Sequence, residues 1–285
     1  MKYSPPGARL AIRHVTGFVY DGLAEASYNE ARMTPLASPR QNVLDATLTI
    51  WPLASQLTYI DYFGTVVTAF DLHEPHGQLE VTADATVEIF HDVPHGQLVS
   101  RNELRDRQLV DRYGEYLVPT SRTTLPGVLH HELAERELST DIVELVDQVS
   151  TQVRDRVAYV TGSTHVQTTA IEAWDQRTGV CQDLSHVTIS LLRGLGIPSR
   201  YVSGYLHPDP DAAVGETVLG QSHAWVEYFA GAWVGIDPTN GNEIGLGHVA
   251  VAKGRDYGDV PPLKGIYHGA VSRALGVTVE ITKLS

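Results

Sequence analysis

The sequence is poor in cysteine: its 285 residues include one, Cys181. A single thiol cannot form an intramolecular disulfide, and it cannot supply the thiolates of a Cys₄ or Cys₂His₂ zinc site. A disulfide scaffold and a cysteine-rich metal domain are therefore excluded. Cys181 is then either a small buried apolar residue, the usual fate of a free cysteine, or a nucleophile.

Long apolar runs and excess positive charge are also lacking. No stretch approaches the roughly 18 apolar residues that a membrane helix needs, and no apolar segment follows Met1–Gly7 as it would in a signal peptide. Lys and Arg number 21 against 34 Asp and Glu, a formal charge of -13. These features predict a cytoplasmic globular protein that binds neither membranes nor nucleic acid.

Strand signals dominate the first hundred residues, where apolar and polar residues alternate. Turn formers such as Asp21-Gly22 separate several of the alternating runs. We predict an α+β protein whose residues 1–100 form an antiparallel, sandwich-like β module. The runs are Leu10–Tyr20, Ala24–Met33, Val43–Trp51, Leu57–Phe63, Val66–Leu72 and Leu79–Phe90.

The remaining chain divides into a connecting segment and a second domain. Residues 101–138 show no clean period, which predicts a connection with short helices. From 139 to 285 helix and strand signals alternate, and we predict a domain there. One helix begins near Ser139 with Thr140 or Asp141 as its cap, and another runs from about Cys181 to Arg193. The predicted strands are Ser199–His207, His223–Phe229, Trp233–Asp237 and Val277–Leu284.

Cys181 opens the second of these helices, directly after Gly179-Val180. The start of a helix presents unpaired amide groups and a partial positive charge, and both favour a thiolate. The thiolate is the form of cysteine that attacks carbonyl carbons. Its position therefore makes Cys181 a candidate nucleophile.

A histidine and an aspartate bracket a predicted hairpin further along the chain. If Phe229–Gly231 is a three-residue turn, Tyr228 pairs with Ala232 and His223 lies directly across from Asp237. A carboxylate beside a histidine orients the ring and stabilises its charged form. Such a histidine, brought to the thiol of Cys181, would complete a nucleophile and base pair.

Three further polar residues lie near Cys181 in the sequence. His186 lies five residues after Cys181, so it points away from the thiol and is expected to pack in the core. Asp183, in the first helical turn, is expected to complement the helix dipole. Gln176 could donate to an oxyanion, although the Cys181 amide is better placed.

Histidine spacing does not predict a metal site. His73 and His76 flank Pro75, His91 and His95 flank Pro94, and His130-His131-Glu132 are adjacent. The prolines make a helical pair of ligands doubtful, and no four-ligand zinc spacing is present. We expect these residues in surface loops, and we expect no metal and no cofactor.

Several motifs resemble those of bacterial transglutaminase-like proteins, and the resemblance extends over most of the chain. The downstream segments Gly247-His248 to Asp256-Tyr257 and Asp259-Val260-Pro261-Pro262 resemble the same group, as does the N-terminal run with Asn29–Pro35 and Asp61–Gly64. The motifs around the candidate residues are Thr178-Gly179-Val180-Cys181-Gln182-Asp183, Gly196-Ile197-Pro198-Ser199-Arg200-Tyr201, His223-Ala224-Trp225-Val226-Glu227 and Asp237-Pro238-Thr239-Asn240.

The resemblance implies a papain-like core, in which a cysteine-bearing helix packs on an antiparallel sheet. It implies Cys181 as nucleophile, His223 as base and Asp237 as orienting acid, with Gln182, Trp225 and Asn240 lining the site. The expected activity is cysteine-dependent hydrolysis of a peptide or glutamine-type amide in a peptide or protein substrate, through a thioester. The alternatives are transamidation, a non-catalytic binding module, and a metal-dependent hydrolase. The oligomeric state stays open.

Overall fold

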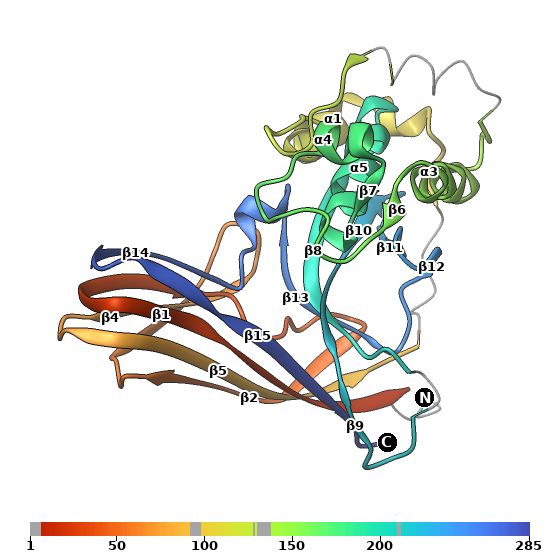
Figure 1. The fold of residues 1–285 in the computed structure, drawn as a ribbon. Coiled ribbons are helices and arrows are strands. Elements are labelled where there is room, and N and C mark those ends of the chain that lie inside the picture. The colour runs from red at the N-terminus through yellow and green to blue at the C-terminus, as the bar shows by residue number, and fades with distance from the viewer. Residues whose placement is uncertain (1–6, 92–97, 128, 130–137, 210–211) are drawn as a thin grey trace.

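The computed structural model describes residues 7–91, 98–127, 129, 138–209 and 212–285. Its strands form two large antiparallel sheets and one two-stranded parallel pair, β6 (Ala158–Tyr159) with β7 (Thr178–Gly179). Figure 1 shows the larger sheet, built from both ends of the chain, beside a smaller sheet that the helices accompany. The α+β class with a strand-rich N-terminal region is confirmed.

The eight-stranded sheet is organised around one long strand, β1 (Ala8–Ala31). The first half of β1 lies between β5 and β15, and its second half between β4 and β14. Side chains from β1, β2, β4 and β5 share one apolar core, consistent with the predicted sandwich-like module. The other strands are β2 (Gln41–Trp51), β3 (Gln56–Ile60), β4 (Val66–Leu72), β5 (His76–Ile89), β9 (Thr217–Leu219), β14 (Leu263–Gly269) and β15 (Ser272–Lys283).

Two details of this sheet differ from the sequence prediction. The chain does not turn at Asp21-Gly22: β1 continues, Gly22 takes a φ of 153°, and the pairing with β5 shifts between Val19 and Ala24. Glycine here accommodates an irregularity inside a strand rather than a reversal. The domain boundaries also differ, because residues 263–283, predicted in the second domain, pair with β1.

The five-stranded sheet has the order β12-β11-β10-β8-β13 and packs against the helices. Its strands are β8 (Ser199–Leu206), β10 (Gln221–Phe229), β11 (Trp233–Asp237), β12 (Asn242–Glu243) and β13 (His248–Gly254). The helices are α1 (Arg107–Tyr113), α3 (Ile142–Arg156), α4 (Ala170–Gln176) and α5 (Cys181–Gly194), with short 3₁₀ turns at Glu103–Arg105, Gly114–Tyr116 and Tyr257–Asp259.

Of the two cap candidates for the first helix the structure uses Asp141, so α3 begins at Ile142, and α5 begins at Cys181 as predicted. Asp141 caps α3 by accepting hydrogen bonds from the amides of Val143 and Glu144. The apolar stripe of α3 and the buried face of α5 meet the sheet in one core, because their apolar residues recur at helical spacing. Among the described residues, no helix combines the length and hydrophobicity needed to cross a bilayer.

The two sheets join through a buried interface. The His14 ring on β1 lies 3.0 Å from the Tyr205 hydroxyl on β8, and apolar residues of β1, β5, β8, β13 and β15 form one cluster. The side-chain amide of Gln41 donates to the Ala250 carbonyl (2.9 Å) and accepts from the Ala250 amide (2.8 Å). Ala250 borders a register shift in β13, so Gln41 completes the hydrogen bonding of an irregular strand.

Candidate active site

The side chain of Cys181 stands at the first residue of α5 and is partly exposed. The turn before it is fixed by Asp183, whose buried carboxylate accepts hydrogen bonds from the Val180 amide (2.8 Å) and the Thr164 hydroxyl (2.6 Å). A side chain on Gly179 would meet the Asp183 Cβ at 2.7 Å, which explains the glycine. Asp183 thus acts on the backbone at the helix start, as expected.

His223 on β10 and Asp237 at the end of β11 are joined by a hydrogen bond. The distance from His223 Nε2 to Asp237 Oδ2 is 2.7 Å, and both side chains are buried. The predicted register is wrong by two residues, because Phe229 pairs with Trp233 and the turn is Ala230–Ala232. The two residues are therefore diagonal rather than directly opposite. A shift of two keeps both side chains on the predicted face.

The carboxylate of Asp237 accepts five hydrogen bonds. Oδ2 accepts from His223 Nε2, from His248 Nε2 at 3.1 Å and from Asn240 Nδ2 at 2.7 Å. Oδ1 accepts from the amides of Thr239 (2.9 Å) and Asn240 (3.2 Å). Burial alone raises the pKa of Asp237, but the hydrogen bonds from His223 and His248 dominate and hold that pKa well below its usual range. Asp237 is a fully buried, ionised anchor.

The other ring nitrogen of His223, Nδ1, is available to the Cys181 thiol. Because Nε2 donates to Asp237, Nδ1 is the ring nitrogen left to interact with the Cys181 thiol, which helps to raise the pKa of His223. Burial lowers the pKa of His223, but the hydrogen bonds with Asp237 and Cys181 outweigh it and raise the pKa to about 9. The described residues therefore form a continuous chain, from Cys181 through His223 to Asp237, with a protonated imidazole at neutral pH.

Trp225 and His248 complete the surroundings of this chain. The buried indole lies edge-on to His248 (5.3 Å between ring centroids) and 6.3 Å from His223. It passes over Gly204 of β8, where an added Cβ would meet the indole Cη2 at 2.6 Å. Glycine at 204 therefore makes room for the ring. The indole and the five hydrogen bonds fix the two histidines around Asp237.

The remaining predicted site residues differ in whether they contact Asp237. Asn240 contacts Asp237 directly, whereas Gln176 is an exposed residue at the end of α4, and Gln182 is buried in the first turn of α5. His186 is fully buried and accepts a hydrogen bond from the Tyr257 amide; burial lowers its pKa to about 3. It is the core histidine expected from its helical position.

The sequence reasoning did not single out His248 as a site residue. The only signal was its place in the downstream motif Gly247-His248. It lies 11 residues from Asp237, separated by an irregular connection with no periodicity to read. The contact depends on β13 returning to the sheet on the far side of β8, which pattern alone does not reveal.

Two histidines and a carboxylate are also metal-ligand types, and the three ligand atoms of His223, Asp237 and His248 lie within 4.8 Å of one another. The contacts of 2.7 and 3.1 Å are hydrogen-bond distances, whereas zinc ligands lie roughly 3.3 Å apart at tetrahedral geometry. His248 Nδ1 accepts from the Gly245 amide, so its proton is on Nε2, facing Asp237. The cluster is a hydrogen-bond network.

Of the predicted loop histidines, His95, His130 and His131 lie outside the described residues.

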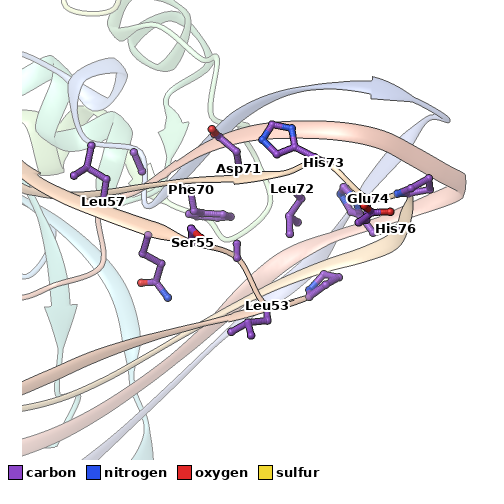
Figure 2. Close-up of a pocket in the computed structure, with 14 residues that line it drawn as sticks. Leu53, Ser55, Leu57, Phe70, Asp71, Leu72, His73, Glu74 and His76 are labelled. Carbon is purple, nitrogen blue, oxygen red and sulfur yellow. Dashed lines mark hydrogen bonds between the residues drawn. The ribbon is translucent and has the colours of Figure 1, made fainter.

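Two cavities differ in their relation to this network. A cavity of about 500 Å³ is lined by Asn240 and His248, both bonded to Asp237. A larger one, about 670 Å³, lies on the eight-stranded sheet, where Figure 2 shows Leu53, Phe70 and Leu72 around it. None of the residues lining the larger cavity belongs to the Cys181, His223 and Asp237 chain. Volume therefore does not identify the reactive centre here.

Two family models and several relatives match this chain. Residues 10–88 match the bacterial transglutaminase-like N-terminal region, and residues 132–238 match the transglutaminase-like superfamily. An uncharacterized protein of Mycobacterium leprae is 43% identical over 280 residues, covering 97% of this chain and 99% of that protein. A protein-glutamine gamma-glutamyltransferase of Pseudomonas aeruginosa is 36% identical over 70 residues, 23% of this chain and 10% of that protein.

A solved structure shares the fold over the whole chain. The crystal structure of a candidate cysteine protease from Cytophaga hutchinsonii superposes with a TM-score of 0.75 at 22% identity, covering 98% of this chain and 91% of that one. At this identity the similarity shows the fold alone. The fold includes both the strand-rich N-terminal region and the core with Cys181.

Proposed function

The chain belongs to the bacterial transglutaminase-like family, and from that premise we propose that it is a cysteine-dependent amide hydrolase. The observation that carries the proposal is the continuous chain from the partly exposed Cys181 to the buried, five-fold hydrogen-bonded Asp237 through His223. Its substrate is a peptide or protein, and neither nucleic acid nor membrane is a partner. We place the activity in the cytoplasm, where the single thiol stays reduced; cell fractionation tests that location.

The proposed reaction has two halves. The Cys181 thiolate attacks the amide carbonyl carbon, and the amide at the start of α5 helps to hold the oxyanion. The carbon–nitrogen bond then breaks while His223 Nδ1 gives its proton to the leaving amine, which leaves a thioester. In the second half, neutral His223 takes a proton from water, the hydroxide attacks the thioester, and the acid and the thiol are released.

Burial raises the pKa of Asp237, but hydrogen bonds from His223, His248 and Asn240 outweigh burial and hold that pKa low, so Asp237 stays ionised throughout both halves. The imidazole changes charge while its Nε2 remains bonded to Oδ2. The carboxylate therefore orients the ring and stabilises the imidazolium without itself taking a proton. Asn240 contributes to this anchor from the site's rim, since it is exposed and yet bonded to Asp237.

Transamidation is the second candidate. It is favoured by the stretch of 70 residues that is 36% identical to the Pseudomonas aeruginosa gamma-glutamyltransferase. A primary amine would replace water in the second half, with the same thioester. Water is the default acceptor, so hydrolysis is the proposed reaction unless an amine is guided in and water is kept out.

The direct test offers a glutamine-containing peptide and a labelled primary amine to the full chain. We expect release of ammonia and appearance of glutamate, with no label in the peptide; peptide-bond cleavage, read by mass spectrometry, would equally support a hydrolase. Label incorporation would instead assign the transferase reaction. Cys181→Ala serves as the control, and it should lose all turnover.

The same variant separates the two remaining alternatives. A metal-dependent hydrolase would keep activity in Cys181→Ala and lose it on chelation with EDTA. A binding module on this fold would leave an ordinary thiol, with a pKa of about 8.5, that resists iodoacetamide at pH 6. We expect rapid alkylation of the wild-type thiol at that pH and no effect of EDTA on turnover.

A further inference from the structure

Among the described residues, His248 is a buried side-chain donor to Asp237 that takes no step of its own in the proposed reaction. Its Nε2 lies 3.1 Å from Oδ2, the oxygen that also binds His223. Its Nδ1 lies 3.0 Å from the Gly245 amide, and a backbone amide can only donate. Nδ1 is therefore the acceptor of a neutral ring, and Nε2 carries the proton.

The ring of His248 is held from two sides. The indole of Trp225 meets it edge-on at 5.3 Å, and the connection from Gly245 to Gly247 supplies the amide that fixes its tautomer. His248 is also the first residue of β13, two residues before Ala250, whose backbone is bonded to Gln41 of the eight-stranded sheet. The donor to Asp237 is thus positioned by both sheets.

Asp237 occupies the end of β11, next to the turn that includes Asn240, and its carboxylate needs donors from several directions to keep one orientation. The Thr239 and Asn240 amides fix Oδ1. Oδ2 accepts from His248 beside His223, although β10 and β8 separate β13 from β11 in the sheet. Without His248, Oδ2 loses one of its side-chain donors, and the carboxylate is less firmly held in one orientation.

From these contacts we infer that His248 is a positioning residue for the proposed reaction. As a neutral donor it holds the Asp237 carboxylate in the orientation that keeps His223 Nδ1 against the Cys181 thiol. The inference rests on the proposed function, but it concerns the geometry of the thiolate pair and does not depend on which amide is the substrate. It also gives a role to the N-terminal module, whose Gln41 holds β13 in place.

The test uses alkylation of the full chain by iodoacetamide at pH 6. An ordinary thiol is less than about 1% ionised there, so rapid reaction reports the thiolate paired with His223. Because the chain has a single cysteine, intact-mass spectrometry reads Cys181 alone. We expect His248→Phe, which fills the space without donating, to react about 10- to 100-fold more slowly than the wild type.

Two further variants serve as controls for His248→Phe. His248→Gln can place a side-chain amide donor near Asp237 Oδ2, and we expect it to react within about threefold of the wild type. His207→Phe is the matched control, since His207 is also a buried histidine lining the 500 Å³ cavity but bonds the Asp209 amide. It should react like the wild type. Thermal melting confirms that each variant is folded.

Wild-type speed in folded His248→Phe would overturn the inference, and so would equal slowness of the Phe and Gln variants. A second measurement needs no variant: the ¹⁵N shifts of the wild-type His248 ring should show protonation on Nε2 alone at pH 7. Protonation on Nδ1 would refute the inference even if His248→Phe did not fold. Slow alkylation of the wild type itself would refute the proposed function instead.

Discussion

The two large sheets differ in how they expose apolar side chains. Strands of the eight-stranded sheet carry Leu57 at 68% exposure, Ile60 at 62% and Ile266 at 73%. Among the described strands of the five-stranded sheet, no large apolar side chain is exposed to a similar degree. The smaller sheet, buried by helices on one part and by the larger sheet on another, holds all the strand residues that bond to Asp237.

This difference explains why the proposed chemistry is assigned to the smaller sheet. Hydrogen bonds and ion pairs strengthen where water is excluded, and an anionic side chain such as Asp237 is tolerated there only because every direction supplies a donor. The larger cavity beside β3 is lined by both apolar and polar side chains, and its His76 bonds the Glu74 carbonyl and Ser27 rather than a buried carboxylate. The candidate site is therefore marked by the hydrogen-bond donors that converge on Asp237, and not by the size of a cavity.

The largest expected effect comes from neutralising the buried carboxylate. In Asp237→Asn one end of the side chain becomes a donor and faces donors, so His223 loses its partner or changes tautomer. We expect the turnover of an amide substrate, measured as kcat/KM, to fall by about 10²- to 10⁴-fold, as with other catalytic His–Asp pairs.

Asp71→Asn is the matched change on the eight-stranded sheet. Asp71 is exposed and lines the larger cavity (Figure 2). We expect its kcat/KM to stay within about twofold of the wild type, because surface substitutions away from a network have small effects. Comparable losses in both variants would break the distinction between the two sheets.

Local patterns predicted the elements and the positions of the candidate site residues better than the long-range strand pairing. The helix start at Cys181, the cap at Asp141 and the face shared by His223 and Asp237 follow from spacing within a few residues. The pairing of β15 with β1 joins residues more than two hundred positions apart, and no local signal encodes it. The same holds for His248, which reaches Asp237 only after β13 has joined β8.

The hairpin register shows how a local signal can mislead in detail. Gly231 was expected to close the turn and instead occupies its middle, with a φ of 92°. Glycine marks where a left-handed residue is needed but not how many residues precede it. The prediction of shared face survived because the error was an even number of residues. An error of one would have sent His223 and Asp237 to opposite faces.

A smaller expected effect concerns stability: one buried histidine in each sheet changes the free energy of unfolding, and the two do so in different pH ranges. The pKa of His223 is raised to about 9, so its charge stabilises the fold fully below pH 6.5 and this contribution is lost as the pH rises through 9. Burial lowers the pKa of His14 to about 4, so its contribution is present above pH 6.5 and is lost as the pH falls toward 4. The two sheets therefore respond in opposite directions.

We expect the free energy of unfolding, measured by urea denaturation, to fall by about 3 kcal/mol between pH 6.5 and pH 9.5 because of His223. His223→Gln should remove most of this alkaline decline. His14→Gln, the matched change on the eight-stranded sheet, should keep it. If the decline persisted in His223→Gln, loss of the proton from the His223 imidazole would not be its cause.

Buried polar side chains, among them Gln41, link the two sheets in addition to an apolar surface. Gln41 is 3% exposed, and its amide bonds both backbone groups of Ala250, as a neighbouring strand would. Gln56, on β3 of the same sheet, is exposed, lines the larger cavity and donates one longer hydrogen bond (3.3 Å) to the Leu48 carbonyl. The two glutamines thus offer the same chemistry in opposite settings.

Gln41→Ala should lower the free energy of unfolding by about 1–3 kcal/mol, because the Ala250 amide loses its acceptor inside the interface. Gln56→Ala should change it by less than about 0.5 kcal/mol, since water can replace its partner. Urea denaturation of both variants against the wild type measures the difference. Equal changes would mean that the sheets are not coupled through β13. A larger loss in Gln41→Ala, together with slower alkylation of Cys181 at pH 6, would show that the eight-stranded sheet acts on the thiol through the strand that carries His248.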